Sequence, residues 1–302
     1  MSDNPFLKHM GFSKTDKVVI FHADDVGMCS SSVTAFTQLI EMKALSSGSA
    51  MVPCSWFPSI ANYCKTATET DLGVHTTFTS EWSNYRWRPV STCDHNSGLI
   101  DADGYFPKTI AQVQKTATST HIDAEVNMQI DRALEAGVDV SHIDMHMGAM
   151  LHPNFLPAYV KAGVSRGIPV LAYRMSREQL SKWNNPELAE RIPKIIEDLE
   201  MKGFPVIDHF YQTNLSKPLS RFEELKQQLK LLKPGLTHVI LHPAEDTPEL
   251  RDICPDWAGR TADFDVLRSK QFNQLVQNEG IVKIGYRDLR NVMKIHRGDV
   301  GK

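Results

Sequence analysis

The sequence predicts an α/β fold in which parallel strands curl into a distorted (β/α) barrel. Short, continuously apolar runs of strand length alternate with longer segments of helical spacing along the whole chain. Buried strands of this kind are typical of parallel sheets with helices outside them. Roughly seven or eight such units in one chain favour a TIM-barrel-like closure over an open sheet. No change of composition marks a linker, so we expect a single domain over residues 1–302.

The expected strands are apolar segments bounded by turn or helix residues. They cover residues 17–23, 48–53, 72–78, 140–146, 169–174, 205–211, 237–242 and 282–286. Helical spacing is clearest near residues 31–42, 120–136, 154–166, 220–232 and 262–278. Residues 79–108 follow neither pattern, and we interpret them as a long loop insertion. Loops of that length inside a compact domain are usually functional.

Composition narrows the class of protein. The net charge of −3 and the absence of a basic block give no electrostatic footprint for nucleic acid or an anionic membrane surface. No apolar stretch has the length of a membrane span or the form of a signal peptide. The five cysteines are scattered without a CxxC pair, which argues against disulfides and thiolate zinc sites. We therefore expect a cytoplasmic protein without nucleic-acid or membrane partners, and a homodimer stays possible.

Ionisable side chains stand at the ends of most predicted strands. Because the carboxyl ends of parallel strands converge on one face of a barrel, these groups should meet in space. One such residue alone is commonly a cap or a hydrogen-bonded surface group, but its recurrence on strand after strand indicates a site. The strand-end residues are Asp24, Asp25, His75, Thr77, His142, Asp144, His146, Arg174, Asp208, His209 and His242.

The segment His142-Ile-Asp144-Met-His146 indicates metal chemistry. Strand alternation places its three polar side chains on one face. Such a row can present an imidazole to a metal while the carboxylate orients a ligand from behind. One Asp with two His leaves coordination positions open for water and substrate, as in catalytic sites. Zinc suits nitrogen ligands best, and magnesium, manganese, cobalt or nickel are alternatives.

The long loop carries Trp82 and Trp87 in an aromatic and arginine-rich stretch. These rings could form a sugar-stacking surface, or they could anchor the loop on the barrel. Thr77, His142 and Asp144 are further candidates for contacts with a substrate.

An ordered set of motifs resembles the YdjC-like (ChbG-type) carbohydrate deacetylases. His22-Ala-Asp-Asp-Val-Gly27 resembles the Asn-Ala-Asp-Asp-Phe-Gly motif that opens that family, with His and Val in place of Asn and Phe. Gly73-Val-His75, His142-Ile-Asp-Met-His146, Leu241-His-Pro243 and Gly285-Tyr-Arg-Asp-Leu289 are similar to its later motifs, in the same order. The resemblance runs from Val18 to Leu289.

The resemblance implies a metal-dependent hydrolase that removes N-acetyl groups from amino sugars such as chito-oligosaccharides. Carried over by position, Asp25, His75 and His146 would bind one divalent metal ion. Asp24 would be the general base, His242 the candidate general acid, and Arg174 would orient or polarise the site.

Two other functions fit the same residues. A barrel metallohydrolase acting on a phosphoester or a non-sugar amide would use similar Asp and His groups. A non-catalytic sugar-binding protein is the second alternative, although a binder has no need of a base beside its metal.

Overall fold

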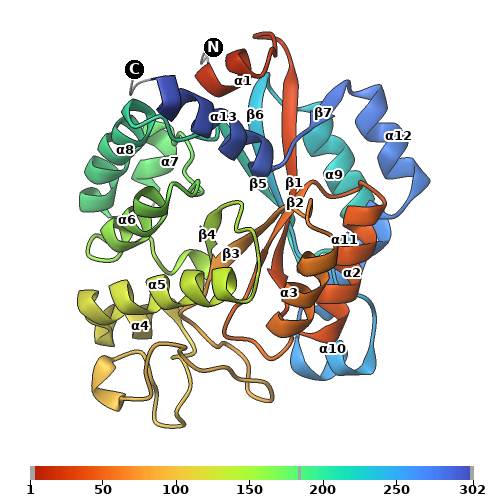
Figure 1. Ribbon diagram of the computed structural model, residues 1–302. Coiled ribbons are helices and arrows are strands. Elements are labelled where there is room, and N and C mark those ends of the chain that lie inside the picture. Colours follow the sequence, from red (N-terminus) through yellow and green to blue (C-terminus); the bar gives the residue numbers. More distant parts are fainter. Residues whose placement is uncertain (1–3, 183–184, 300–302) are drawn as a thin grey trace.

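The computed structural model describes residues 4–182 and 185–299, and its centre is a curled sheet of parallel strands (Figure 1). Within these ranges the sheet has seven strands, in the order β4-β3-β2-β1-β6-β5, and β7 also pairs with β1. The strands are β1 (Lys17–Val26), β2 (Ser47–Ala50), β3 (Leu72–Thr76), β4 (Ile143–Met145), β5 (His209–Gln212), β6 (Gly235–Leu241) and β7 (Ile281–Lys283). The predicted class of parallel α/β fold is confirmed.

The two edges of this sheet approach each other through the segment 170–173. Val170 bridges to Ile143 on β4, and Tyr173 bridges to Ile207, just before β5. The expected strand over 169–174 is therefore wrong as a continuous element. The segment changes its neighbour between Val170 and Tyr173, so no unbroken ladder of hydrogen bonds forms. The result is the distorted barrel that the sequence predicts.

Helices cover the outside of the sheet (Figure 1). In the described ranges they are α1 (Pro5–His9), α2 (Ser30–Glu41), α3 (Phe57–Thr66), α4 (Ile110–Thr116), α5 (Ser119–Glu135), α6 (Leu156–Arg166), α7 (Arg177–Ser181), α8 (Pro186–Met201), α9 (Arg221–Lys230), α10 (Pro248–Ile253), α11 (Trp257–Leu267), α12 (Lys270–Asn278) and α13 (Tyr286–Asp299). The expected helix over 262–278 is two helices. Ser269 separates them, because its hydroxyl accepts the Phe272 amide and caps α12. No helix in the described residues is long and apolar enough to cross a membrane.

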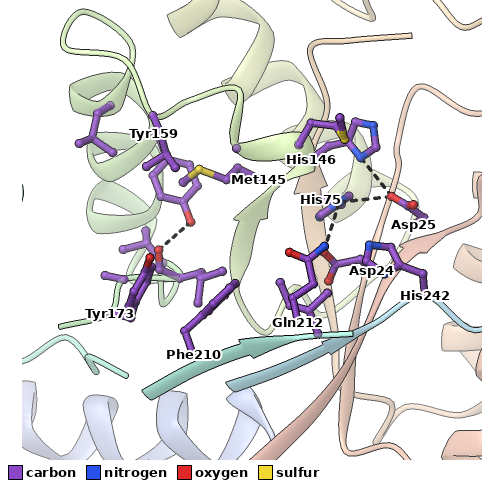
Figure 2. A pocket seen from close by; sticks show the side chains of 18 of the residues that line it. Asp24, Asp25, His75, Met145, His146, Tyr159, Tyr173, Phe210, Gln212 and His242 are labelled. Atoms are coloured by element: carbon purple, nitrogen blue, oxygen red, sulfur yellow. Dashed lines mark hydrogen bonds and ion pairs between the residues drawn. The ribbon is translucent and has the colours of Figure 1, made fainter. Parts of the chain in front are cut away.

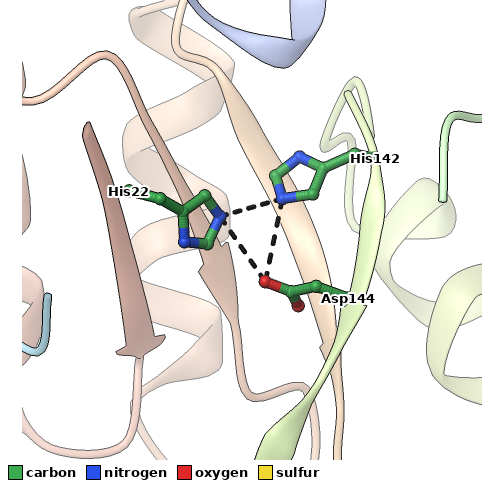
Figure 3. Close-up of side chains that lie close together, drawn as sticks. All are labelled: His22, His142 and Asp144. Atoms are coloured by element: carbon green, nitrogen blue, oxygen red, sulfur yellow. Dashed lines mark hydrogen bonds and ion pairs between the residues drawn. The ribbon is translucent and has the colours of Figure 1, made fainter. Parts of the chain in front are cut away.

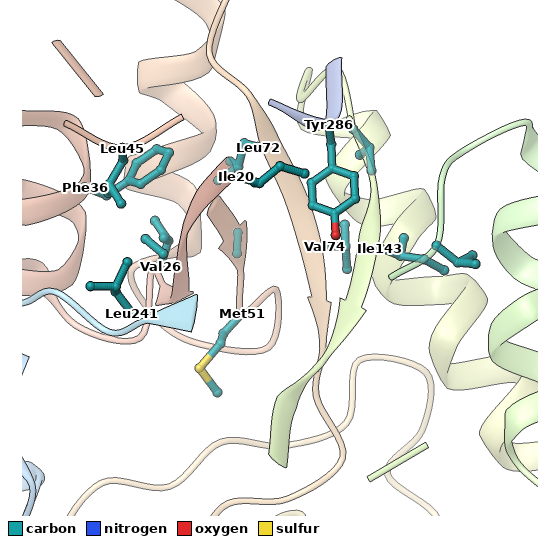
Figure 4. Packing of buried hydrophobic residues seen from close by; sticks show 14 of the residues in the cluster. Ile20, Val26, Phe36, Leu45, Met51, Leu72, Val74, Ile143, Leu241 and Tyr286 are labelled. Carbon is teal, nitrogen blue, oxygen red and sulfur yellow. The ribbon is translucent and has the colours of Figure 1, made fainter. Parts of the chain in front are cut away.

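Strand β1 is the central element of the core. One of its edges pairs with β6, while the other pairs with β7 near Lys17 and with β2 from His22 onward. Residues 18–23 are completely buried. Ile20 of β1 belongs to the same buried hydrophobic cluster as Val74 of β3 and Ile143 of β4 (Figure 4). The carboxyl end of β1 is consequently held rigidly, and it carries Asp24 and Asp25.

The predicted loop insertion is an irregular segment between β3 and α4, with one short turn, η1 (His95–Ser97). The indole N–H of Trp87 donates to the Thr79 carbonyl at 2.8 Å, and the buried Glu125 carboxylate accepts the amides of Val90 and Ser91. These bonds satisfy buried backbone groups of the loop and attach it to the barrel.

A buried ion pair supports the carboxyl end of β6. Arg221 is 1% exposed, and its Nε lies 2.6 Å from Oδ1 of Asp263, which is itself fully buried. The other oxygen of Asp263 accepts the backbone amide of His242 at 2.8 Å. Burial costs each charge its hydration, so each depends on its partner.

We predict that Arg221→Met lowers the free energy of unfolding by about 3–5 kcal/mol, because it leaves Asp263 buried without its cation. Urea denaturation measures this difference. Lys226→Met is the control on the same helix, since Lys226 forms a more exposed pair with Glu223, and it should change stability by about 0.5 kcal/mol or less. Equal stabilities of the two variants would contradict the assigned role of the pair.

Candidate metal centre

The structure brings together Asp25, His75 and His146, which three separate strand ends supply. Asp25 is the penultimate residue of β1, His75 lies on β3, and His146 begins the turn η2 (His146–Gly148) after β4. Oδ1 of Asp25 lies 3.4 Å from Nε2 of His75 and 3.1 Å from Nδ1 of His146. The three donor atoms lie within 4.8 Å of one another, and all three residues are buried. Figure 2 shows them facing a common point.

Each of these three side chains is held from behind by a charged partner. Nδ1 of His75 donates to Oδ1 of Asp144 at 2.7 Å, and Nε2 of His146 donates to Oε1 of Glu81 at 2.9 Å. Nη1 of Arg260 donates to Oδ2 of Asp25 at 2.7 Å. Partners of this kind fix the tautomer and the orientation of metal ligands. They leave one nitrogen of each imidazole and one oxygen of Asp25 directed at the shared space.

The backbone at the site is strained at two residues. Asp25 has φ +60° and Met147 has φ +55°, both in the left-handed region. Such conformations cost non-glycine residues about 1–3 kcal/mol each, and they cluster at functional sites. The first of these two turns is at the candidate ligand Asp25, and the second directly follows the candidate ligand His146.

The electrostatics of the cluster favour positive charge between its carboxylates. Burial alone would lower the pKa of His146, but Glu81 and Asp25 raise it to about 9. The pKa of His75 is likewise raised well above its usual range, because Asp144 and Asp24 outweigh the effect of burial. Burial would raise the pKa of Asp25, but Arg260 and His146 hold it well below the ordinary value.

The residues fit a divalent metal ion. Oδ1 of Asp25 is buried and receives no well-aligned hydrogen bond from the described part of the chain. A cation in the shared space would be a partner for Oδ1 of Asp25. It would also take the place of the protons on His75 and His146, whose pKa values the neighbouring carboxylates raise. Two nitrogens and one oxygen are a ligand set typical of catalytic zinc and related ions.

Asp24 and His242 lie beside the ligands and line the same cavity. Oδ1 of Asp24 is 2.8 Å from Nδ1 of His22, and burial raises the pKa of Asp24 to about 7. Burial lowers the pKa of His242, whose buried Nδ1 has no hydrogen-bond partner among the described residues. The pKa of Asp24 therefore suits proton transfer near neutral pH, whereas the lowered pKa of His242 favours its neutral imidazole.

Three of the predicted substrate contacts lie behind the cavity wall instead. Thr77 is fully buried, and its hydroxyl donates to the His75 carbonyl at 2.7 Å. Asp144 holds His75, as described above. His142 stacks on Tyr286 with 3.8 Å between ring centroids, and its Nε2 lies 2.9 Å from Nε2 of His22 (Figure 3). We therefore correct the roles of these three residues from substrate contact to support of the site.

The His22, His142 and Asp144 group could also hold a metal by composition. Its two imidazole nitrogens are at hydrogen-bond distance, and Nε2 of His22 lies 3.5 Å from Oδ2 of Asp144. All three residues are enclosed in the barrel core and none lines the cavity. A hydrogen-bonded support beneath the candidate metal centre explains this arrangement.

Arg174 is not where the sequence predicts it. Its guanidinium pairs with Asp208 and Glu200, and none of these three residues lines the cavity. No continuous strand ends at Arg174, and these two carboxylates hold its side chain. Arg260 on α11 takes the place beside Asp25, and no pattern in the sequence identifies it.

The two tryptophans of the loop have different roles. Trp82 lines the cavity, and the guanidinium carbon of Arg260 lies 5.7 Å from its ring centroid. Trp87 is 3% exposed and does not line the cavity. Its hydrogen bond to Thr79 supports the alternative that it anchors the loop. Glu81, from the same loop, is a site residue that the sequence analysis did not identify.

Fold and site together define an α/β-barrel protein with a buried Asp-His-His cluster suited to one metal ion. The chain belongs to the family described as YdjC-like protein, whose pattern matches residues 18–278. The resemblance of the motifs to that family is confirmed.

Related proteins carry the name carbohydrate deacetylase. The one from Thermus thermophilus is 30% identical over 265 residues, which cover 86% of this chain and 89% of the relative. The one from Thermoanaerobacter pseudethanolicus is 23% identical over 274 residues, which cover 91% of this chain and 100% of the relative. A crystal structure from Enterococcus faecalis V583, whose name refers to cellobiose-phosphate cleavage, matches with a TM-score of 0.74 at 18% identity. The match covers 91% of this chain and 99% of that one, and it supports the fold.

We predict that Asp144→Asn weakens zinc binding about 10–100-fold, because the His75 imidazole loses the carboxylate that orients it. Competition with a chromogenic chelator measures the affinity. Asp265→Asn, which changes an exposed partner of Arg268, is the matched control and should bind zinc as the unaltered protein does. Unchanged affinity in Asp144→Asn, with circular dichroism showing a folded protein, would be evidence against this metal centre.

Proposed function

We propose that this protein is a metal-dependent hydrolase that removes N-acetyl groups from an amino sugar or a chito-oligosaccharide. The observation that carries the proposal is the cluster of Asp25, His75 and His146 with the Asp24 carboxylate beside it, 3.7 Å from Nε2 of His75. A site that only binds a sugar does not require a base at that position. The carbohydrate deacetylases among its relatives support the amino-sugar substrate.

In the proposed reaction Asp25, His75 and His146 hold the ion, and zinc or magnesium is the expected species. When bound, a divalent ion polarises a carbonyl oxygen and lowers the pKa of a water ligand. Asp24 accepts the proton of the attacking water, which its pKa of about 7 allows near neutral pH. The bond from His22 to Asp24 orients that carboxylate.

His242 is the proposed proton donor to the departing amine. Its lowered pKa keeps the imidazole neutral before the reaction, so it must gain a proton during the reaction before it donates one. The negative charges of Asp25 and Asp24 both favour the protonated imidazole of His242 and so assist its gain of a proton. Arg260 keeps Asp25 ionised throughout.

The cytoplasm stays the predicted location, and the five cysteines, all unpaired in the structure, are compatible with a reducing compartment. A homodimer also stays a prediction.

The proposed function is tested by acetate release from N-acetylglucosamine oligomers, measured beside a panel of phosphoesters. We expect the zinc- or magnesium-loaded protein to release acetate, a chelator to abolish the release, and added metal to restore it. Phosphate release without acetate release would favour the phosphoesterase alternative. Tight sugar binding without turnover of any substrate would favour the sugar-binding alternative.

We predict that Asp24→Asn lowers kcat by about 10²–10⁴-fold while the metal stays bound, because the amide cannot accept the proton of water. Metal content is measured on the same samples as the rate. Asp265→Asn is the control for the same chemical change, because Asp265 pairs with the exposed Arg268 and does not line the cavity. Unimpaired turnover by metal-loaded Asp24→Asn would exclude Asp24 as the base.

A further inference from the structure

The cavity of about 520 Å³ that contains the metal cluster has two chemically different ends. The polar end holds the cluster together with Asp24, Glu81 and Arg260. The other end is walled by α6, α8 and the segment 170–175, and its side chains are almost entirely hydrocarbon. They include Leu156, Val160, Leu171, Ile192, Ile196 and Phe210. Figure 2 shows the cluster on one side and Met145, Tyr159, Tyr173 and Phe210 on the other.

A sugar ring does not suit the apolar end. The Tyr159 hydroxyl already donates to the Ile143 carbonyl at 2.8 Å, and the Tyr173 ring is stacked on Phe210 with centroids 4.9 Å apart. Gln212 lies beside the polar cluster in Figure 2. A sugar buried among the aliphatic side chains would leave several hydroxyls without partners, which is unfavourable. A hydrocarbon group has no such cost and gains from leaving water.

The apolar surface begins directly at the metal ligands. Met145 precedes His146 in the chain, and both line the cavity, as does Ile240 next to the cluster. A substituent that enters the apolar end beside the ligands would therefore start close to the carbonyl to be cleaved. The acyl chain of an amide meets that condition. An apolar aglycone does not, because the sugar ring separates it from the carbonyl.

The polar end suits the sugar instead. Trp82 offers a ring face, and Arg260, Asp256 and Glu81 offer charged groups that could bond hydroxyls. The loop that carries Glu81 and Trp82 lies at this end. The scissile amide would then lie between a sugar on the loop side and an acyl group on the α6 and α8 side.

We infer that the substrate is an amino sugar whose N-acyl group is an aliphatic chain longer than acetyl, with that chain in the apolar end of the cavity. The inference rests on the proposed function and specifies its substrate. The whole cavity of about 520 Å³ lies within the range of about 300–1,000 Å³ found for ligand sites, so it has room for a sugar at the polar end and an acyl chain at the apolar end. In the reaction, water adds its oxygen to the carbonyl carbon, the C–N bond breaks, and the nitrogen takes a proton. The products are a fatty carboxylate and a free amino sugar.

The test is a series of glucosamines acylated on nitrogen with acetyl, butanoyl, hexanoyl, octanoyl, decanoyl and dodecanoyl groups. Amine release measures kcat/KM for each compound with the metal-loaded protein. We expect kcat/KM to rise by up to about fourfold per methylene until the chain fills the apolar end, and then to fall. The octyl glycoside of N-acetylglucosamine, compared with N-octanoylglucosamine, tests the position of the chain and should gain little over the acetyl compound.

The outcomes separate this inference from the proposed function. Fastest hydrolysis of the acetyl compound, with a decline along the series, would overturn the inference and leave the deacetylase proposal standing. An equal gain from the octyl glycoside would also overturn it, because the chain would then belong to the aglycone. No amine release from any member would overturn the inference, and the acetate assay on N-acetylglucosamine oligomers would decide the proposed function separately.

A substitution in the apolar wall tests the same inference without the metal. Ala172 lines this end of the cavity, whereas Ala189 on α8 does not. Calorimetry on the metal-free protein should show that N-decanoylglucosamine binds with a negative heat-capacity change, and that Ala172→Phe weakens binding at least about tenfold. Ala172→Phe should also move the optimum in the activity series to shorter chains, and Ala189→Phe should leave the optimum unchanged. If Ala172→Phe does not fold, Val160→Phe takes its place, since Val160 also lines this end of the cavity. A folded variant of either kind that keeps the chain-length optimum of the unaltered protein would overturn the inference.

Discussion

The buried carboxylate of Asp25 is the group on which the arrangement of the site depends. It lies between two imidazoles and a guanidinium near the end of the central strand β1, in a left-handed backbone conformation. A buried charge of this kind is costly unless it is paired. Its partners come from β3, from the turn after β4 and from α11, so this single requirement draws distant parts of the chain to one end of the barrel. Glu81 adds the long loop to the same network through His146.

The same network explains how a deeply buried site can be polar at one end and apolar at the other. The charged side chains of the cavity are concentrated around the metal cluster, where they pair with one another. The wall formed by α6 and α8 can therefore be apolar. The cavity can therefore accommodate a carbonyl at the metal, hydroxyl groups near the loop and hydrocarbon against the helices. In this account the specificity for the acyl group comes from the wall of the barrel, and the chemistry comes from the strand ends.

Much of the fold and part of the site could be predicted from the sequence. Apolar runs that end in Asp or His identified β1, β3, β4 and β6 and placed Asp24, Asp25, His75 and His242 at one face. Strand alternation alone was misleading for His142, because β4 ends at Met145 and His146 lies in a turn. His146 thereby reaches the cavity, while His142 stays in the core with His22.

The helix α8 was not predicted, because Pro193 and its many charged residues obscure the helical pattern. Arg260 and Glu81 could not be found, because residues that pair across the fold leave no periodic signal in the sequence. In addition, the sequence analysis had already assigned the role of the site's arginine to Arg174.

The proposed site holds one cation between the side chains of residues 25, 75 and 146. Anomalous scattering from crystals grown with zinc, recorded on both sides of the zinc absorption edge, would locate that ion. We expect one strong peak at about 2.0–2.2 Å from Oδ1 of Asp25, Nε2 of His75 and Nδ1 of His146. A peak among His22, His142 and Asp144 instead, or no ordered zinc in the cavity at all, would contradict it.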